Sequence, residues 1–188
     1  MNISQDEEYK GHQKLTPMMM QYHQVKAKYQ EEIVLFRMGD FYEMFHEDAI
    51  SASKILNITL TSRNKNDSSP VPMCGFPFHA AKSYIEKLIE AGKKIAVCEQ
   101  MGSSDGSALL ERVVHQVITP GMILDESLLT PKTNNFLVAI FITAIKPQIL
   151  SYGIASLDIS TGECKITTTS SEESCADEIS RLEPNEII

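Results

Sequence analysis

Helix-like and strand-like segments alternate along the first two thirds of the chain, and this alternation constrains the fold more than any other feature of the sequence. Thr16 can cap a first helix, and Pro17 suits its first helical position. Asn57 is expected to end a second helix in the left-handed conformation. The predicted order is helix 16–30, strand 32–38, helix 47–56, strand 58–62, helix 79–92, strand 93–100 and strand 112–119. Such alternation predicts a compact, mixed-sheet α/β domain.

Polar stretches separate these elements and set the expected domain limits. Residues 63–77, RNKNDSSPVPMCGFP, are rich in Asn, Ser, Pro and Gly and are predicted to form a long loop. GSSDGS, residues 102–107, is predicted to be a flexible loop. The expected organisation is a flexible tail over 1–14, a first domain over 15–120, a linker over 121–134 and a second domain over 135–188.

The last third of the chain has a different pattern. Its three apolar, β-branched runs at 136–143, 152–160 and 164–169 are joined by short turns, which predicts an antiparallel meander. Ser170 and Glu173 form a capping-box pattern for a helix over 174–184. NEII, residues 185–188, is expected to begin a strand, and a further strand and its covering helix would complete such a domain.

Composition and charge exclude several classes of protein. No apolar run approaches the roughly 20 residues of a membrane helix, and the polar N-terminus is no signal peptide. The four cysteines lack Cys-x-x-Cys spacing, so reduced thiols in a cytoplasmic protein are expected. The histidines are scattered and form no HExxH motif, so a metal site is not expected. The net charge is −8, of which residues 1–120 contribute −2 and residues 121–188 contribute −6. Any nucleic-acid contact is therefore expected in the first part, on a local basic patch.

Catalysis is not expected within these residues. No phosphate-binding loop, dinucleotide fingerprint or nucleophile elbow is present. The densest acidic group comprises Asp40, Glu43, Glu47 and Asp48. Asp158 lies in the meander, where a ribonuclease-like site would begin, but no second acid is placed to share a metal with it. A lone acid at a strand end is expected to be structural.

Several motifs together resemble the N-terminal part of the MutS family of bacterial DNA mismatch repair proteins. They are TPMMMQYHQVKAKY, FRMGDFYEMFHEDA, LTSRN, PVPMCGFPFHAAKSYIEKLIEAGKKIAVCEQMG, ERVVHQVITPG and LDISTGE, in order from about Leu15 to the end of the chain. The resemblance implies that residues 15–120 are a mismatch-recognition domain. It implies that the rest is the first part of a connector domain with a ribonuclease H-like α/β fold. The ATPase, lever and clamp parts of the family would lie outside these residues.

The resemblance also implies a role for Phe41 and Glu43 in the stretch MGDFYEMF. In an extended segment these two side chains project to the same side. The family places an aromatic wedge at the mismatch, from the minor groove of kinked DNA, and a mismatched step costs less to open than a matched one. Phe41 would be this wedge, and Glu43 would hydrogen-bond the same base. A protonated Glu43 would donate to a base nitrogen, and an ionised one would accept from an N–H; both states remain open.

Other contacts with DNA are expected from basic and apolar residues nearby. Arg63 and Lys65 are candidates for phosphate contacts, and Arg37 is a further candidate. The family places the segment of Pro72 and Met73 beside the minor groove, where it braces the DNA or packs on the wedge strand.

The sequence departs from the family at several positions. Phe78 stands where Tyr is usual, Cys74 where a small residue is common, and Phe76 where an aliphatic residue is common. These three are expected to be packing changes. ERVVHQV, residues 111–117, carries fewer basic residues than its counterparts often do, which lowers the expectation of phosphate contacts from that strand.

The expected partners follow from the same resemblance. They are mismatched double-stranded DNA, the MutL protein through the connector domain over 135–188, and a second copy in a full-length homodimeric parent. This fragment itself is expected to be monomeric and cytoplasmic, associated with the bacterial nucleoid and not with a membrane. No cofactor is expected here, because ATP and Mg²⁺ would bind the parent's ATPase domain. Two alternatives are a nuclease, which added magnesium would reveal, and a protein-interaction module with no DNA binding of its own.

Overall fold

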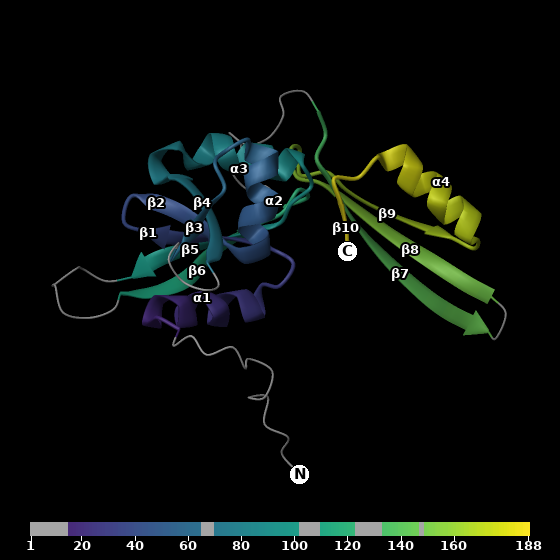
Figure 1. The fold of residues 1–188 in the computed structure, drawn as a ribbon. Coiled ribbons are helices and arrows are strands. Elements are labelled where there is room, and N and C mark those ends of the chain that lie inside the picture. The colour runs from purple at the N-terminus through teal and green to yellow at the C-terminus, as the bar shows by residue number, and fades with distance from the viewer. Residues whose placement is uncertain (1–14, 65–69, 102–109, 123–132, 147–148) are drawn as a thin grey trace, which may run out of the picture.

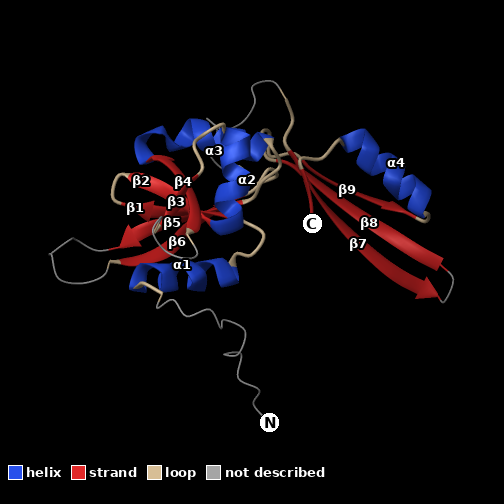
Figure 2. Cartoon of the chain, viewed as in Figure 1, coloured by secondary structure: helices blue, strands red, loops and turns tan. Residues whose placement is uncertain are grey.

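The computed structural model describes residues 15–64, 70–101, 110–122, 133–146 and 149–188. Within them the strands form two separate sheets, shown in Figure 1 and coloured by structure type in Figure 2. The first sheet has the strand order β3-β4-β2-β1-β5-β6. Its strands are β1 (Ile33–Met38), β2 (Phe41–Phe45), β3 (Thr61–Arg63), β4 (Val71–Pro77), β5 (Ile95–Met101) and β6 (Glu111–Ile118). Because β1 and β5 are parallel and the other pairs antiparallel, this is the mixed sheet that the sequence predicts.

Helices cover both faces of this first sheet. Helix α1 (Pro17–Lys28) lies on one face, while α2 (His46–Leu56) and α3 (Ala81–Glu90) lie on the other, with the short 3-10 helix η1 (Phe78–Ala80) before α3 (Figure 1). Each face has its own buried apolar cluster. The predicted α/β fold class is therefore confirmed.

Local sequence signals set the limits of these helices. Thr16 Oγ1 accepts a hydrogen bond from the Met19 N–H at the start of α1. Asn57 ends α2 in the left-handed conformation, with φ of 53°. The predictions for Thr16, Pro17 and Asn57 are confirmed.

The prediction of a long loop over 63–77 is wrong, because Val71–Pro77 forms strand β4 between β2 and β3. Pro72 and Pro77 suggested a loop, since proline cannot donate to a strand ladder. Pro72 pairs only with β3, and Pro77 pairs only with β2. Each proline therefore lies where the strand has a neighbour on one side. The strand predicted at 58–62 is also shifted, since β3 is Thr61–Arg63.

The second sheet has the order β10-β7-β8-β9. Its elements are β7 (Phe136–Lys146), β8 (Ile149–Asp158), β9 (Cys164–Thr169), α4 (Glu172–Leu182) and β10 (Glu186–Ile187). Strands β7, β8 and β9 form the predicted antiparallel meander, and β10 pairs parallel to β7. Helix α4 lies along one face of the meander (Figure 1).

The predicted capping box of α4 is wrong by one position. The N-cap is Ser171, whose Oγ accepts a hydrogen bond from the Ser174 N–H at 3.1 Å. Ser171 has the extended conformation of a cap residue, which leaves Ser170 outside the helix. Since the residue three positions after Ser171 is a serine, the reciprocal bond of a capping box from Glu173 does not form.

Candidate nucleic-acid interface

The hairpin of β1 and β2 presents Phe41 at its end. Met38 pairs with Phe41, so Gly39 and Asp40 form a two-residue turn. Gly39 has φ of 58°, and Asp40 is not among the residues with positive φ. This pattern fits a type II′ turn, in which glycine takes the first central position. The turn makes Phe41 the first residue of β2.

The two faces of β2 have different surroundings. Tyr42 and Met44 point into the core beneath α2 and α3. Phe41, Glu43 and Phe45 alternate onto the face that carries α1. Phe45 is fully buried against Tyr22 of α1, with ring centroids 5.0 Å apart. Phe41 remains 46% exposed. Phe41 is thus a half-exposed aromatic side chain on the same side of the strand as Glu43.

Glu43 lies half-buried in the middle of the same face. It pairs with Phe36 of β1 and with Gly75 of β4. A Cβ at Gly75 would lie 2.7 Å from the Tyr42 carbonyl oxygen and 3.4 Å from Glu43 Cγ, so glycine makes this close approach possible. Burial raises the pKa of Glu43, and the positive charge of Arg63 opposes this rise. Among the described residues, Glu43 Oε2 is buried without a hydrogen-bond partner.

The strand register brings two more predicted residues to this face. Phe45 pairs with Met73, which packs on the cluster beneath α1. Arg63 pairs with Val71 of the same cluster, so it shares this face at the edge strand β3. The structure therefore gathers Phe41, Glu43, Met73 and Arg63 on one face. Lys65 lies outside the described residues.

Arg37 lies on the opposite face, where it pairs with Tyr42. Its Nε donates a 2.5 Å hydrogen bond to the Gly39 carbonyl oxygen, and its guanidinium lies 3.7 Å from the centre of the Phe78 ring. Tyr42 donates to Glu99, and burial together with this bond raises the pKa of Tyr42 to about 12. Sequence reasoning missed this group. The one sequence signal for these contacts was strand alternation, which directs the side chains of Arg37 and Met38 to opposite faces of the sheet.

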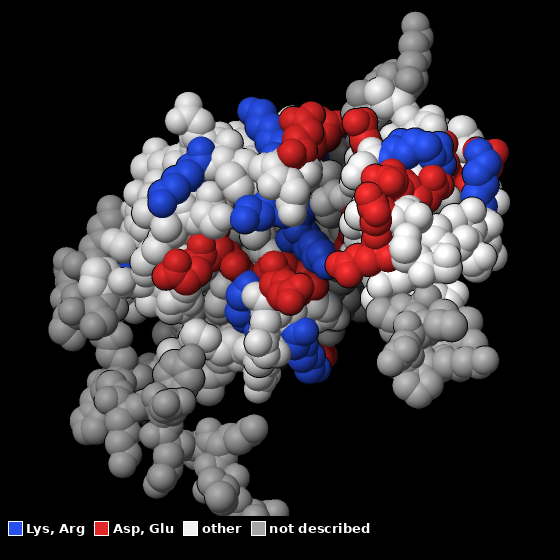
Figure 3. Space-filling model, turned by 90° about the vertical axis from the view of Figure 1, so that its right-hand side faces the viewer, with Lys and Arg blue, Asp and Glu red and all other residues white. Residues whose placement is uncertain are grey.

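Charges of both signs are intermixed on the side of the molecule that Figure 3 shows. Lysine and arginine side chains there lie next to aspartate and glutamate side chains, and no continuous basic patch appears on that side. This side of the molecule therefore presents no broad positive field to a polyanion.

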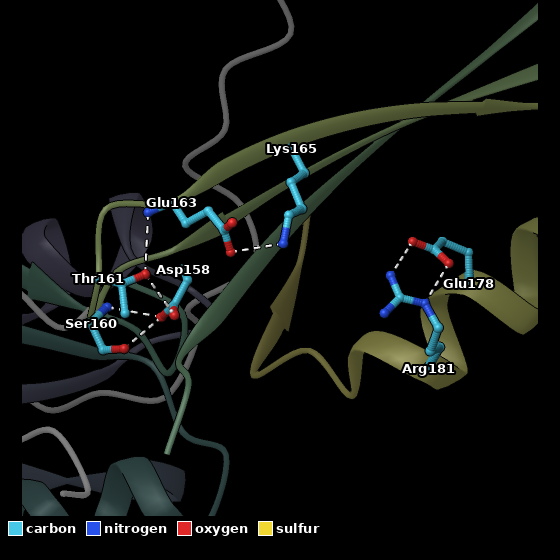
Figure 4. Close-up of polar contacts among 7 residues, drawn as sticks. All are labelled: Asp158, Ser160, Thr161, Glu163, Lys165, Glu178 and Arg181. Carbon is cyan, nitrogen blue, oxygen red and sulfur yellow. Dashed lines mark hydrogen bonds and ion pairs between the residues drawn. The ribbon is translucent and has the colours of Figure 1, made fainter. Parts of the chain in front are cut away.

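Three acids of the second part of the chain, Asp158, Glu163 and Glu178, contact side chains close to them in the sequence (Figure 4). Asp158 is 1% exposed and accepts hydrogen bonds from the N–H groups of Asn135 and Ser160 and from the hydroxyls of Ser160 and Thr161. Burial alone would raise the pKa of Asp158, but these hydrogen bonds lower it to about 2. Asp158 thus holds the β8–β9 turn, in line with the structural role that the sequence predicts.

The described ranges hold neither a candidate metal cluster nor a membrane-spanning helix. In the described ranges, no group of three or more His, Cys, Asp or Glu side chains could hold a metal ion. None of the helices in those ranges has the length and apolar character needed to cross a bilayer. All four cysteines are free thiols, and Cys164 is the exposed one.

Comparison with known protein families identifies both parts of the chain. The model of MutS domain I matches residues 16–127, and the model of MutS domain II matches residues 135–188. The chain belongs to the MutS family. The two matches correspond to the two sheets in order along the chain. The domain limits at 120 and 135 stay a prediction.

Curated relatives are similar over most of the chain. The DNA mismatch repair protein MutS of Desulfatibacillum aliphaticivorans is 50% identical over 176 residues, which are 93% of this chain and 19% of that protein. The proteins of the same name from Alkaliphilus oremlandii and Syntrophobacter fumaroxidans are 47% and 44% identical, each over 93% of this chain and 20% of their own length. The chain therefore spans about a fifth of the length of these MutS relatives.

Proposed function

We propose that this chain binds mismatched or unpaired bases in duplex DNA and thereby initiates DNA mismatch repair. It would act as the N-terminal part of a longer MutS protein, called the parent protein below. One observation carries the proposal: half-exposed Phe41 stands at the end of a hairpin, beside a carboxylate whose Oε2 has no hydrogen-bond partner among the described residues. The family membership and the relatives named DNA mismatch repair protein MutS support it.

Phe41 acts as a wedge in this proposal. A mismatched step stacks and pairs poorly, so less free energy is needed to kink it. An aromatic ring that enters from the minor groove can stack on the exposed base, which typically contributes about 1–3 kcal/mol. The 46% exposure of Phe41 leaves one side of the ring available for such a contact.

Glu43 hydrogen-bonds the same base. A partly desolvated carboxylate gains more from a new hydrogen bond than a solvated one, because less water must be displaced. The raised pKa of Glu43 moves the carboxyl toward its protonated form, which can donate to a base nitrogen. Nearby phosphates would raise the pKa further.

Arg63 and Lys65 contact phosphates and fix the register of the protein on the DNA, while Met73 supports the wedge strand. Arg63 shares the face of Phe41 and Glu43 and lies at the edge of the sheet, where a DNA backbone can approach it. Specificity then comes from the deformability of the mismatch, so the acidic composition of the chain is no obstacle.

The rest of the parent protein supplies other activities. We propose that its ATPase domain binds ATP and Mg²⁺, that it forms a homodimer, and that residues 135–188 contact MutL. The excess of acidic residues over 121–188 favours a protein partner there over DNA. The chain itself binds and does not cleave DNA. Incubation with duplex and added magnesium should leave the DNA intact, and cleavage would instead support the nuclease alternative.

The direct test is replacement of the wedge. Phe41→Ala in the parent protein should reduce binding to a mismatched duplex by roughly 5- to 100-fold and leave binding to the matched duplex nearly unchanged. Phe141→Ala is the control, since Phe141 is an exposed phenylalanine of the second sheet. Equal discrimination by the Phe41→Ala and parent proteins would refute the wedge. If neither protein prefers a mismatch, the alternative of an interaction module without DNA binding gains support.

A further inference from the structure

We infer that Arg37 and Phe78 clamp the β1–β2 turn and so position Phe41 at the mismatch. The inference rests on the proposed function, because it concerns how the wedge is held. Both are positioning residues that contact the turn rather than the DNA. The sequence made Arg37 a candidate for a phosphate contact and Phe78 a packing change.

Both carbonyl groups of the turn are held by this pair. The Gly39 carbonyl oxygen accepts the 2.5 Å hydrogen bond from Arg37 Nε. The Asp40 carbonyl oxygen accepts a 2.9 Å hydrogen bond from the Phe78 N–H. A two-residue hairpin turn normally leaves its carbonyls to water. Here the residue directly before Phe41 is fixed from a separate segment of the chain.

The Arg37 guanidinium joins these contacts into one unit. It lies 3.7 Å from the centre of the Phe78 ring and 5.5 Å from the centre of the Tyr42 ring. A planar cation over aromatic faces is a favourable arrangement, and it also restricts the rotamers of all three side chains. The Arg37 carbonyl oxygen accepts a 2.8 Å hydrogen bond from Arg112 Nε of β6. The turn is therefore connected to the far edge of the sheet.

The position of Arg37 favours this role over a phosphate contact. Arg37 points to the face of Tyr42, opposite to the face of Phe41 and Glu43. A wedge must keep its place while a base pair is displaced, and a side chain that is ordered beforehand loses less entropy on binding. Phe78 is 42% exposed, so its ring does little for the core and is available for the stack with Arg37.

Two conservative variants of the parent protein test the clamp. Arg37→Lys keeps the charge but loses the planar fork, and Phe78→Leu keeps an apolar side chain but loses the ring. Each should lower the preference for mismatched over matched duplex by roughly three- to ten-fold, with an unchanged salt dependence and melting temperature. The double variant should lose no more than the stronger single one, because both remove the same stack. Phe78→Tyr keeps the ring and should retain the parent's preference.

The background of Phe41→Ala separates the clamp from the wedge. In that background, Arg37→Lys should change neither the affinity for matched duplex nor the affinity for mismatched duplex, because no wedge remains to be positioned. If Phe41→Ala removes discrimination while Arg37→Lys and Phe78→Leu keep it, the clamp is refuted and the proposed function stands. A flatter salt dependence in Arg37→Gln than in Arg37→Lys, with equal losses on both duplexes, would make Arg37 a phosphate contact and also refute it. If Phe78→Leu lowers the melting temperature, its effect on binding includes a loss of stability, and the result for Arg37→Lys then decides whether the clamp exists.

Discussion

The two sheets of this chain expose apolar side chains in different ways. The first sheet has helices on both faces, and Phe41 is exposed at the end of one hairpin, next to a half-buried carboxylate. The second sheet has α4 on one face, while Phe141 and Ile166, 71% and 78% exposed, share the other face. The exposure of Phe41 is local and accompanied by polar groups, as expected at a binding site. The exposure of Phe141 belongs to a broad apolar face, as expected where another element or protein packs.

Replacement of a buried phenylalanine of the first sheet should lower the free energy of unfolding far more than replacement of an exposed one of the second sheet. Phe45 is fully buried beneath α1, whereas Phe141 is exposed. Phe45→Ala should lower the free energy of unfolding by about 3–5 kcal/mol, and Phe141→Ala should change it by no more than about 0.5 kcal/mol. Urea unfolding of the chain, followed by far-UV circular dichroism, measures both. Similar losses in the two variants would mean that the open face of the second sheet is packed after all.

Asp158 should make the second sheet sensitive to acid. Its pKa in the folded chain is about 2, below the ordinary value of 3.8. Its stabilising effect is therefore complete above the ordinary value and is lost as the pH falls from about 4 to about 2, an expected change of about 2 kcal/mol. Asp158→Asn should remove this pH dependence, as measured by amide hydrogen exchange of β8 and β9 at both ends of the range. An unchanged pH profile would show that other carboxyl groups cause it.

Arg63 should distinguish the two regions in DNA binding. If it contacts a phosphate, Arg63→Ala in the parent protein should weaken matched and mismatched duplexes alike by roughly 1.5 kcal/mol. The slope of log affinity against log salt should flatten by about 0.9. The same is expected of Lys65→Ala. Arg181 in α4 is paired with Glu178, and Arg181→Ala should have no effect. A loss confined to mismatched DNA, with an unchanged slope, would contradict the phosphate contact.

Replacement of Glu43 should change affinity for the matched duplex, whereas replacement of Phe41 should change affinity for the mismatched duplex, and the change at Glu43 is the smaller one. On matched DNA no base is offered to Glu43, so its charge only repels phosphates. Glu43→Gln should therefore tighten binding to the matched duplex, by on the order of 1 kcal/mol, more than to the mismatched duplex. Glu163→Gln, at an exposed carboxylate of the second sheet, is the control. Titrations at fixed pH and salt measure both, and unchanged affinity of Glu43→Gln for matched DNA would contradict the repulsion between Glu43 and the phosphates.

Much of the fold followed from local signals in the sequence. The cap at Thr16, the terminator at Asn57 and the three-stranded meander depend on neighbouring residues and could be read directly. Strand β4 could not, because its prolines are tolerated only through their positions beside β2 and β3. The cap of α4 was misassigned because two serines are adjacent there, and only the backbone conformation distinguishes them.

Some features of the candidate site could likewise be predicted from the sequence, and others depend on tertiary structure. The shared side of Phe41 and Glu43 follows from strand alternation alone. The pairing of Glu43 with Gly75 and the approach of Phe78 to Arg37 depend on tertiary structure, because these residues are far apart in the sequence. The assignment of a wedge and of a base contact depends on the family resemblance, and it stays a proposal.

In the proposed function, the first sheet contacts the mismatched base through Phe41. The most direct measurement places a photoreactive phenylalanine analogue at position 41 or at position 141 and maps crosslinks on a duplex with one mismatch. Position 41 should crosslink at the mismatched step and weakly to matched duplex, while position 141, although more exposed, should give no crosslink at the mismatch. Crosslinks of equal yield from both positions, or from position 41 without preference for the mismatch, would contradict the claim.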